Sequence, residues 1–206
     1  MTARTLVLVG NGLDTRGLAA ALKPFDIALG TIERGLRHDA PCDEPRAAHL
    51  LSRSGPFDGV LLAPAFVDGP DGPTVDDLLD VLTSCFSVIK AAIASFEERA
   101  VAGRVIALLP GGATMGEPGE AINSALAGAM LSLFRTVALE MRSTPVTVNT
   151  LVYATRAADG PTGGGVLGDP EALACMIASL LGSGARGING QEIYALAGAD
   201  VGRLHP

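Results

Sequence analysis

The chain has 206 residues, of which 48% are hydrophobic, and it carries a formal net charge of -7 at pH 7. This length and composition suffice for a hydrophobic core without metal or disulfide support, so we expect a single domain spanning residues 1–206. The acidic balance and the lack of a basic run in the sequence argue against nucleic acid or an anionic membrane as a partner.

Strand and helix signals alternate from the start of the chain. The apolar run RTLVLVG, residues 4–10, ends in glycine and precedes helix formers with a proline stop over residues 18–25. A strand at 25–30, a brief helix at 44–52 and a buried strand at 57–66 are predicted next. Residues 75–102 follow a threonine cap with an acidic first turn, and their apolar spacing predicts a long helix.

The second half of the chain continues the alternation. Its pattern predicts strands at 103–110, 146–154 and 190–196, a long helix at 120–141 and a shorter helix at 169–182. Strands that alternate with helices favour a parallel sheet with helices on both faces. We therefore predict an α/β fold, a doubly wound parallel sheet in a Rossmann-like three-layer α/β/α arrangement.

The cysteines and the N-terminus bear on location. Cys42, Cys85 and Cys175 are odd in number and widely spaced, which predicts buried, reduced thiols and no metal site. The first strand begins within five residues of the start, without a signal-peptide pattern, and no uninterrupted apolar run reaches about 18 residues. These features predict a cytoplasmic protein without a membrane span.

Residues 105–154, which begin VIALLPGG and end VNTLVYA, resemble the catalytic half of a short-chain dehydrogenase/reductase (SDR). Residues 168–198 resemble the late helix and final strand of the family, which carries a Gly-Gln pair, here Gly190 and Gln191. FDGVLLAPAF stands where the family has a strand ending in Asn-Asn-Ala-Gly. The resemblance therefore covers nearly the whole chain.

The family's catalytic positions are all replaced in this sequence. Its Tyr-x-x-x-Lys pair falls on Asn123 and Ala127, its serine at or beside Pro110, and its helix asparagine near Val81. Hydride transfer in the family needs a phenol as acid or base and a lysine that lowers the phenol's pKa and holds the ribose. An amide and a methyl group do neither, so we expect no catalytic residue in this chain.

The cofactor turn of the family is altered as well. Gly10, Asp14 and Arg16 occupy the places of the three glycines that let a diphosphate approach the backbone. A carboxylate at Asp14 would repel the diphosphate. The second predicted strand ends at residues 29–31, Leu-Gly-Thr, which offer no charged partner for the ribose. We expect this chain to bind no cofactor, and NAD(P) to reside in a catalytic partner.

The substrate side of the family's site is also reduced. Tyr153 and Ala154 replace the Pro-Gly pair that follows the fifth strand, and the lid segment shrinks to residues 155–168, which are too rich in glycine for a stable helix pair. Tyr153 is either a displaced proton donor or, as we favour, an amphipathic residue at the core edge.

Other polar residues have structural explanations. We expect His49 to be solvated, Asn149 to satisfy backbone groups, and Ser124 and Thr114 to lack a nearby base. A turn and a helix N-terminus account for the acidic residues Asp68, Asp71, Asp76 and Asp77 without a cation.

The resemblance implies that the assembly surface is retained. In SDRs the two long helices pack against the same pair of a partner, and the turn at Gly190 and Gln191 meets a second partner. The helix residues assigned to this interface form apolar stripes. They are Leu82, Phe86, Ile89, Ile93, Ala125, Ala129, Leu133, Phe134 and Val137.

These observations favour a non-catalytic SDR-like subunit that assembles with a catalytically competent SDR paralogue as a hetero-oligomer, in the form of a heterotetramer. Pairs of this kind known in the family suggest a hydroxyacyl-CoA or another hydroxyacyl thioester as the substrate of the complex. Two alternatives remain: an atypical active oxidoreductase that uses Tyr153, and a stand-alone nucleotide-binding sensor.

Overall fold

The computed structural model describes residues 4–10, 15–32, 42–66, 73–156, 166–167 and 170–196. Six parallel strands form one sheet in the order β2-β1-β3-β4-β5-β8. The strands are β1 (Arg4–Gly10), β2 (Ile27–Ile32), β3 (Gly59–Ala63), β4 (Arg104–Pro110), β5 (Thr147–Tyr153) and β8 (Glu192–Ala195). β2 lies on one side of β1 and β3 on the other, so the order in which strands are added reverses between β1 and β3. Open α/β sheets bind ligands at the carboxyl ends of the strands at such a point.

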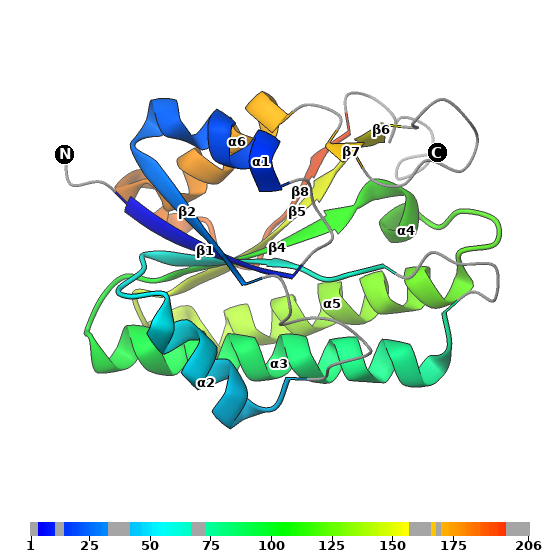
Figure 1. Cartoon of the computed structure of the whole chain (residues 1–206), viewed down its shortest axis with the longest axis horizontal. Helices are drawn as coiled ribbons and strands as arrows, with labels where there is room; N and C mark the ends of the chain where they lie inside the picture. Colours follow the sequence, from blue (N-terminus) through cyan, green and yellow to red (C-terminus); the bar gives the residue numbers. More distant parts are fainter. Residues whose placement is uncertain are drawn as a thin grey trace.

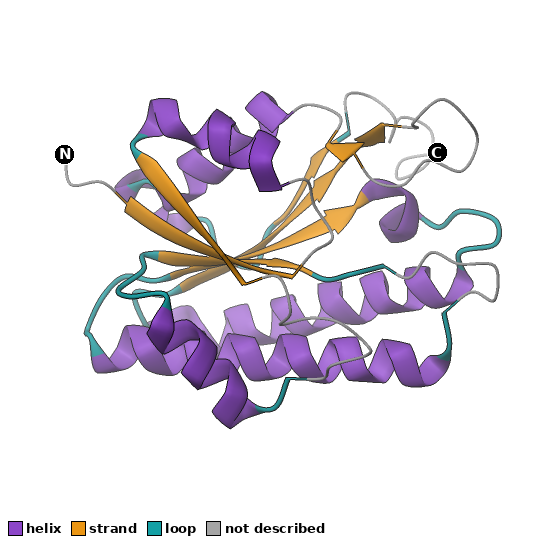
Figure 2. Cartoon of the chain, viewed as in Figure 1, coloured by secondary structure: helices purple, strands orange, loops and turns teal. Residues whose placement is uncertain are grey.

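Helices cover both faces of this sheet (Figures 1 and 2). One face carries α1 (Thr15–Leu22) and α6 (Pro170–Leu181), and the other carries α2 (Glu44–Arg53), α3 (Val75–Glu98) and α5 (Ala121–Glu140). The short helix α4 (Gly111–Met115) follows β4 directly. Single 3₁₀ segments lie at Lys23–Phe25, Met141–Ser143 and Ser183–Gly187. The described part of the chain therefore has the predicted three-layer, Rossmann-like arrangement.

The period of two along each strand divides the core between the two faces. Val7 and Val9 of β1 pack with α2, α3 and α5, whereas Leu6 and Leu8 pack with α1 and α6. β3, β4 and β5 alternate in the same way, and Tyr153 belongs to the α1 and α6 side. A parallel sheet buried on both faces explains why its strands are continuous apolar runs.

Local signals set the ends of the longest helix. Thr74 and Asp77 form a capping box at the start of α3, in which each side chain accepts the other residue's backbone N–H. After α3 the chain passes through Ala100, with φ of 50°, to Gly103. A Cβ at Gly103 would overlap the buried ring of Phe96, so the chain can pass this close to the helix only with glycine.

The predicted strands and helices are confirmed, with shifted boundaries. β2 ends at Ile32 rather than at residue 30, and α3 ends at Glu98 rather than at residue 102. Two elements were not predicted: α4, and an antiparallel pair formed by β6 (Thr155–Arg156) and β7 (Val166–Leu167). The pair lies in the shortened lid segment, and the residues between its strands lie outside the described part of the chain.

Two helices are long and apolar enough to cross a membrane, by length and composition alone. They are Val75–Glu98 and Ala121–Ser143, whose best windows have mean hydropathies of 1.6 and 1.4. The prediction from the sequence concerned uninterrupted apolar runs, whereas these windows tolerate up to two charged residues. Both helices lie along the sheet and contribute Phe96 and Phe134 to the core, and core helices pass the same test.

Candidate functional site

The carboxyl edge of the sheet brings together two of the positions that the sequence resemblance assigns to catalytic residues. Val81 of α3 and Asn123 of α5 line one cavity with neighbours that include Leu78 and Leu126. The cavity has a volume of about 10 Å³, which is room for about one water molecule. Neither a substrate nor a cofactor ring fits between these two residues.

Asn123 is buried and engaged within its own helix turn. Its Nδ2 donates a hydrogen bond of 2.6 Å to Oε2 of Glu120, and 3% of the residue is exposed. One turn further on, Ala127 is fully buried. The two positions that the sequence resemblance assigns to the family's tyrosine and lysine hold an amide already bonded to a carboxylate and a methyl group without access to solvent.

Pro110 ends β4 and precedes the first turn of α4. Its carbonyl oxygen accepts a hydrogen bond of 2.8 Å from Oγ1 of Thr114, which ties that hydroxyl to the helix. The buried Oγ of Ser124 has no hydrogen-bond partner among the described residues. Within the described residues, neither hydroxyl donates to or accepts from a basic side chain.

Tyr153 is the last residue of β5 and stands opposite Pro110 in the strand register. It is 4% exposed and packs in the core below α1 and α6. Burial raises the pKa of its hydroxyl well above the ordinary value of tyrosine. A proton donor or base at neutral pH needs the opposite shift, so the geometry favours the core-edge interpretation of this residue.

The cofactor turn is described only at its two ends. Gly10 ends β1 with φ of 114°, a conformation that favours glycine, and Arg16 is exposed in the first turn of α1. Asp14 lies outside the described residues. Since β2 continues to Ile32, residues 29–31 lie inside the strand, which corrects the prediction that they mark its end. The residue that follows the strand is Glu33, also outside the described part.

Asn149 and Asn189 fix the turn that carries the Gly-Gln pair. Nδ2 of Asn149 donates to the carbonyl of Ile188 at 2.8 Å, and its Oδ1 accepts from the backbone N–H of Gln191 at 3.0 Å. Oδ1 of Asn189 accepts from the N–H of Val148 at 2.8 Å. Gly190 has φ of 72°, a conformation that favours glycine, so the turn itself accounts for a glycine at this position. Gln191 is exposed. The predicted backbone role of Asn149 is confirmed.

Only some of the helix residues predicted to contact a partner subunit are accessible on the surface of the single chain. Ile89, Phe134 and Val137 are buried against the sheet in the chain's own core, so they cannot meet a partner without unfolding. Leu82, Ile93, Ala129 and Leu133 are half-buried, and Phe86 and Ala125 are exposed. Sequence reasoning missed further residues on the outward side of the two helices. They are Val75, Leu79, Gly128 and Leu139.

The remaining polar residues and cysteines singled out in the sequence form no functional site among the described residues. His49 is exposed on α2, and Asp77 is occupied by the cap of α3. Asp68 and Asp71 lie outside the described residues. Cys42 and Cys85 are buried as predicted, but Cys175 is exposed on α6, because its position faces away from the sheet. No group of residues suited to a metal ion occurs in the described part of the chain.

No protein-family model matches the sequence, and no curated protein matches it significantly. Many solved structures do match the fold. A short-chain dehydrogenase from Bacillus anthracis has a TM-score of 0.70 at 17% identity, with 95% of this chain and 96% of that chain covered. A 3-ketoacyl-(acyl-carrier-protein) reductase from Brucella melitensis, in complex with NADH, has a TM-score of 0.74 at 16% identity, with 96% and 98% covered. NAD⁺-bound xylitol dehydrogenase has a TM-score of 0.69 at 18% identity, with 94% and 97% covered.

At these identities the likeness establishes the fold. The chain has the Rossmann-like fold of short-chain dehydrogenases/reductases, over nearly the whole length of each of these proteins.

Proposed function

We propose that the chain is a non-catalytic SDR-like subunit, which assembles with a catalytically complete SDR in a heteromeric NAD(P)-dependent dehydrogenase or ketoreductase. One contrast carries this proposal. Buried side chains fill positions assigned to the catalytic residues, whereas α3 and α5 expose apolar side chains that no described residue covers in the single chain.

The filled positions argue against catalysis by this chain. Asn123 and Ala127 are buried, and the space between Asn123 and Val81 is about 10 Å³. Tyr153, the alternative proton donor, has a pKa raised by burial. Proton transfer to a substrate needs an accessible group whose pKa lies near the working pH.

Gly128 points to a partner helix. It lies in the middle of α5, where glycine costs about 1 kcal/mol relative to alanine. A Cβ at this position would meet no atom within 4 Å, so the fold of the single chain does not require glycine here. A helix of another subunit that approaches closely would require it, since helices pack at about 8–10 Å and small side chains permit the shorter distance.

The neighbouring helix α3 exposes large apolar side chains. Leu79 is 51% exposed and Phe86 is 47% exposed on α3, which lies beside α5 on the same face of the sheet (Figure 1). Ala125 is exposed on α5, one turn before Ala129. Two adjacent helices with exposed apolar residues can pack against an equivalent pair in a four-helix interface. A heterotetramer would use this interface together with the surface near the exposed Gln191.

The substrate class comes from similarity alone. The Brucella melitensis neighbour is a 3-ketoacyl-(acyl-carrier-protein) reductase, and that name fits a hydroxyacyl thioester as the substrate of the proposed complex.

Co-expression tests the proposal. The chain is produced with an SDR that retains the Ser, Tyr and Lys of its family and is encoded beside it, and the product is examined by native mass spectrometry and turnover assays. We expect a stoichiometric complex whose activity exceeds that of either subunit alone. Separate elution of the two proteins, with full activity in the partner alone, would contradict the proposal.

Nucleotide binding without a partner is the second candidate. It is favoured by Glu33, an acidic residue that directly follows β2, where dinucleotide-binding folds bind the ribose hydroxyls. Isothermal titration of the isolated chain with NAD(H) and NADP(H) decides between the two candidates. The subunit proposal predicts no saturable binding below about 1 mM, whereas a low-micromolar Kd would favour the nucleotide-binding candidate.

A further inference from the structure

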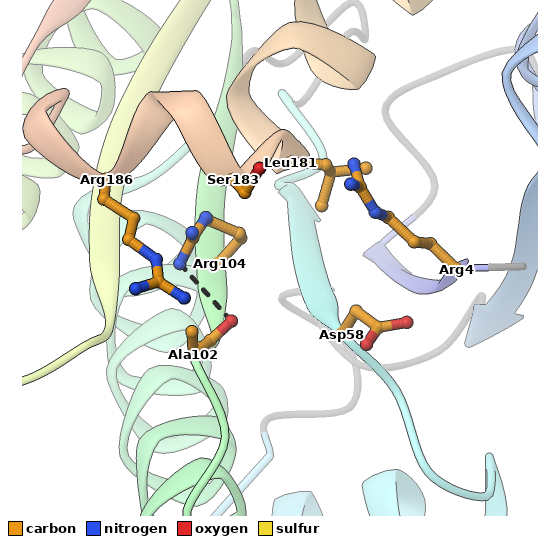
Figure 3. Close-up of a pocket in the computed structure, with 7 residues that line it drawn as sticks. All are labelled: Arg4, Asp58, Ala102, Arg104, Leu181, Ser183 and Arg186. Atoms are coloured by element: carbon orange, nitrogen blue, oxygen red, sulfur yellow. Dashed lines mark hydrogen bonds between the residues drawn. The ribbon is translucent and has the colours of Figure 1, made fainter. Parts of the chain in front are cut away.

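A pocket of about 150 Å³ opens at the amino edge of the sheet, opposite the edge that carries the candidate site. Its charged lining consists of Arg4, Asp58, Arg104 and Arg186, and Ser183 adds a hydroxyl (Figure 3). The chain as a whole has a net charge of -7, so a group of three arginines around one carboxylate is unusual for its surface.

Strand register gathers these residues from distant parts of the sequence. Arg4 begins β1, Arg104 begins β4, and Asp58 directly precedes β3, which lies between those two strands. Gly59 stands beside Arg104 in the register, and a Cβ on it would lie 3.2 Å from Cβ of Arg104 and 2.8 Å from Cδ2 of Leu6. The glycine therefore leaves the space in which Arg104 turns toward the pocket.

Arg104 is held rigidly by neutral acceptors. The residue is 4% exposed, and its Nε donates to the carbonyl of Leu180 at 3.2 Å. Its Nη1 contacts three further carbonyls, those of Gly103 at 2.8 Å, Pro145 at 3.2 Å and Ala102 at 3.3 Å. None of these bonds uses Nη2, so that end of the guanidinium has donors to offer a ligand.

The positive charge of the pocket is not balanced by the described residues. No ion pair with a described residue is formed by Arg4, Arg104 or Arg186. Oδ2 of Asp58 accepts the backbone N–H of Thr5 at 2.8 Å. Three positive charges and one negative charge leave a net +2. Burial is the main cause that lowers the pKa of Arg104, and the charges of Arg186 and Arg4 lower it further.

We propose that this pocket binds a dianionic phosphate group, with Nη2 of Arg104 as a fixed donor and the guanidinium groups of Arg4 and Arg186 on either side of it. Guanidinium groups match the oxygens of phosphate in geometry, and a dianion neutralises the net charge of the pocket. Arg104 and Arg186 reach toward the same space from β4 and from the 3₁₀ segment after α6 (Figure 3). The free ion and a phosphomonoester both present this dianionic group, and the experiment below distinguishes them.

Because this site is remote from the carboxyl edge, the proposal is independent of the function proposed above. It is tested by isothermal titration of the full chain with inorganic phosphate and with glycerol 3-phosphate, at constant ionic strength with chloride as the balancing ion. We expect one site per chain, and about 10- to 100-fold weaker binding in Arg186→Gln, because one charge-assisted contact is lost. Arg186 is exposed, so this variant keeps the fold.

Two further variants make the test specific. Asp58→Asn keeps an acceptor for Thr5 but removes the repelling charge, so we expect tighter binding. Arg46→Gln removes an exposed charge at the opposite edge and leaves affinity unchanged. Binding of glycerol 3-phosphate at least as tightly as phosphate assigns the site to an esterified phosphate, whereas binding of phosphate alone assigns it to the free ion. The absence of saturable binding up to about 10 mM, or equal losses in Arg186→Gln and Arg46→Gln, overturns the proposal.

Discussion

Replacing Ala127 by lysine introduces the residue type that the sequence resemblance assigns to this position and tests whether the space around it is filled. Ala127 is 0% exposed, and the cavity beside the neighbouring Asn123 has a volume of about 10 Å³. A lysine chain does not fit this space, and overpacking a core costs about 1–3 kcal/mol. Its ammonium group would also lose water without a partner, at several kcal/mol, or release its proton.

The two costs together lower the free energy of unfolding of Ala127→Lys by at least about 3 kcal/mol, a large share of the 5–15 kcal/mol typical of a domain. With a urea dependence of about 2 kcal/mol/M, the unfolding midpoint falls by about 1.5 M. Urea titration followed by circular dichroism measures this shift. Ala48→Lys is the matched control, because Ala48 is exposed on α2, and we expect a change below about 0.5 kcal/mol. Equal midpoints for Ala127→Lys and the native chain would show that a space for lysine exists and would refute the reasoning.

Three further predictions concern core packing, the buried hydroxyl of Tyr153 and the buried thiol of Cys85. Gly103→Ala should destabilise the chain by about 1–3 kcal/mol, because the new methyl group overlaps the ring of Phe96; an unchanged melting temperature would show that the ring can move. Tyr153→Phe should leave any turnover of the assembled complex unchanged, since burial raises the pKa of this hydroxyl, and a loss of activity would reinstate Tyr153 as a proton donor. Burial also raises the pKa of the Cys85 thiol, so the unfolded chain releases this proton first, and the free energy of unfolding should fall as the pH rises above about 8.5. The midpoints of urea unfolding at pH 7 and pH 10 check this, and we expect the midpoint of Cys85→Ala to decrease less between these pH values than that of the native chain.

The alternation of strands and helices could be predicted because each element carries a clear period. β1 is a continuous apolar run, and α3 combines a capping threonine with a regular apolar stripe. Boundaries were less certain: β2 continues through Thr31 and Ile32, where the strand pairs with Leu8 and Val9 of β1. A pairing partner is not visible in the sequence, so the end of the strand was placed too early.

The orientation of the long helices could not be predicted to the same degree. α3 and α5 are apolar on more than one side, so apolar spacing alone does not separate the side that faces the sheet from the side that faces outward. Ile89 and Phe134 were assigned to a partner although they face the sheet, and the exposed Leu79 was missed. Only the three-dimensional packing of each helix resolves this ambiguity.

The arginine pocket was also invisible in the sequence. Its four charged residues are separated by tens of positions in the sequence, and no basic run marks them. They come together because parallel strands begin at the same edge of a sheet, with the register fixed by the pairing of Gly59 and Arg104. A linear pattern of charge cannot report such a juxtaposition, since it depends on strand order.

The proposed role as a partner subunit is tested most directly by comparing Gly128→Arg with Asn123→Ala in the co-expressed complex. Gly128 is exposed and its Cβ position is empty, so arginine there should raise helix stability by about 1 kcal/mol while placing a charge in the proposed seam. We predict that Gly128→Arg folds normally but fails to co-purify with the catalytic subunit, and that turnover falls to the level of that subunit alone. Asn123→Ala should assemble and retain nearly full turnover. Intact assembly of Gly128→Arg together with loss of activity in Asn123→Ala would contradict the account and identify the carboxyl edge as a working site.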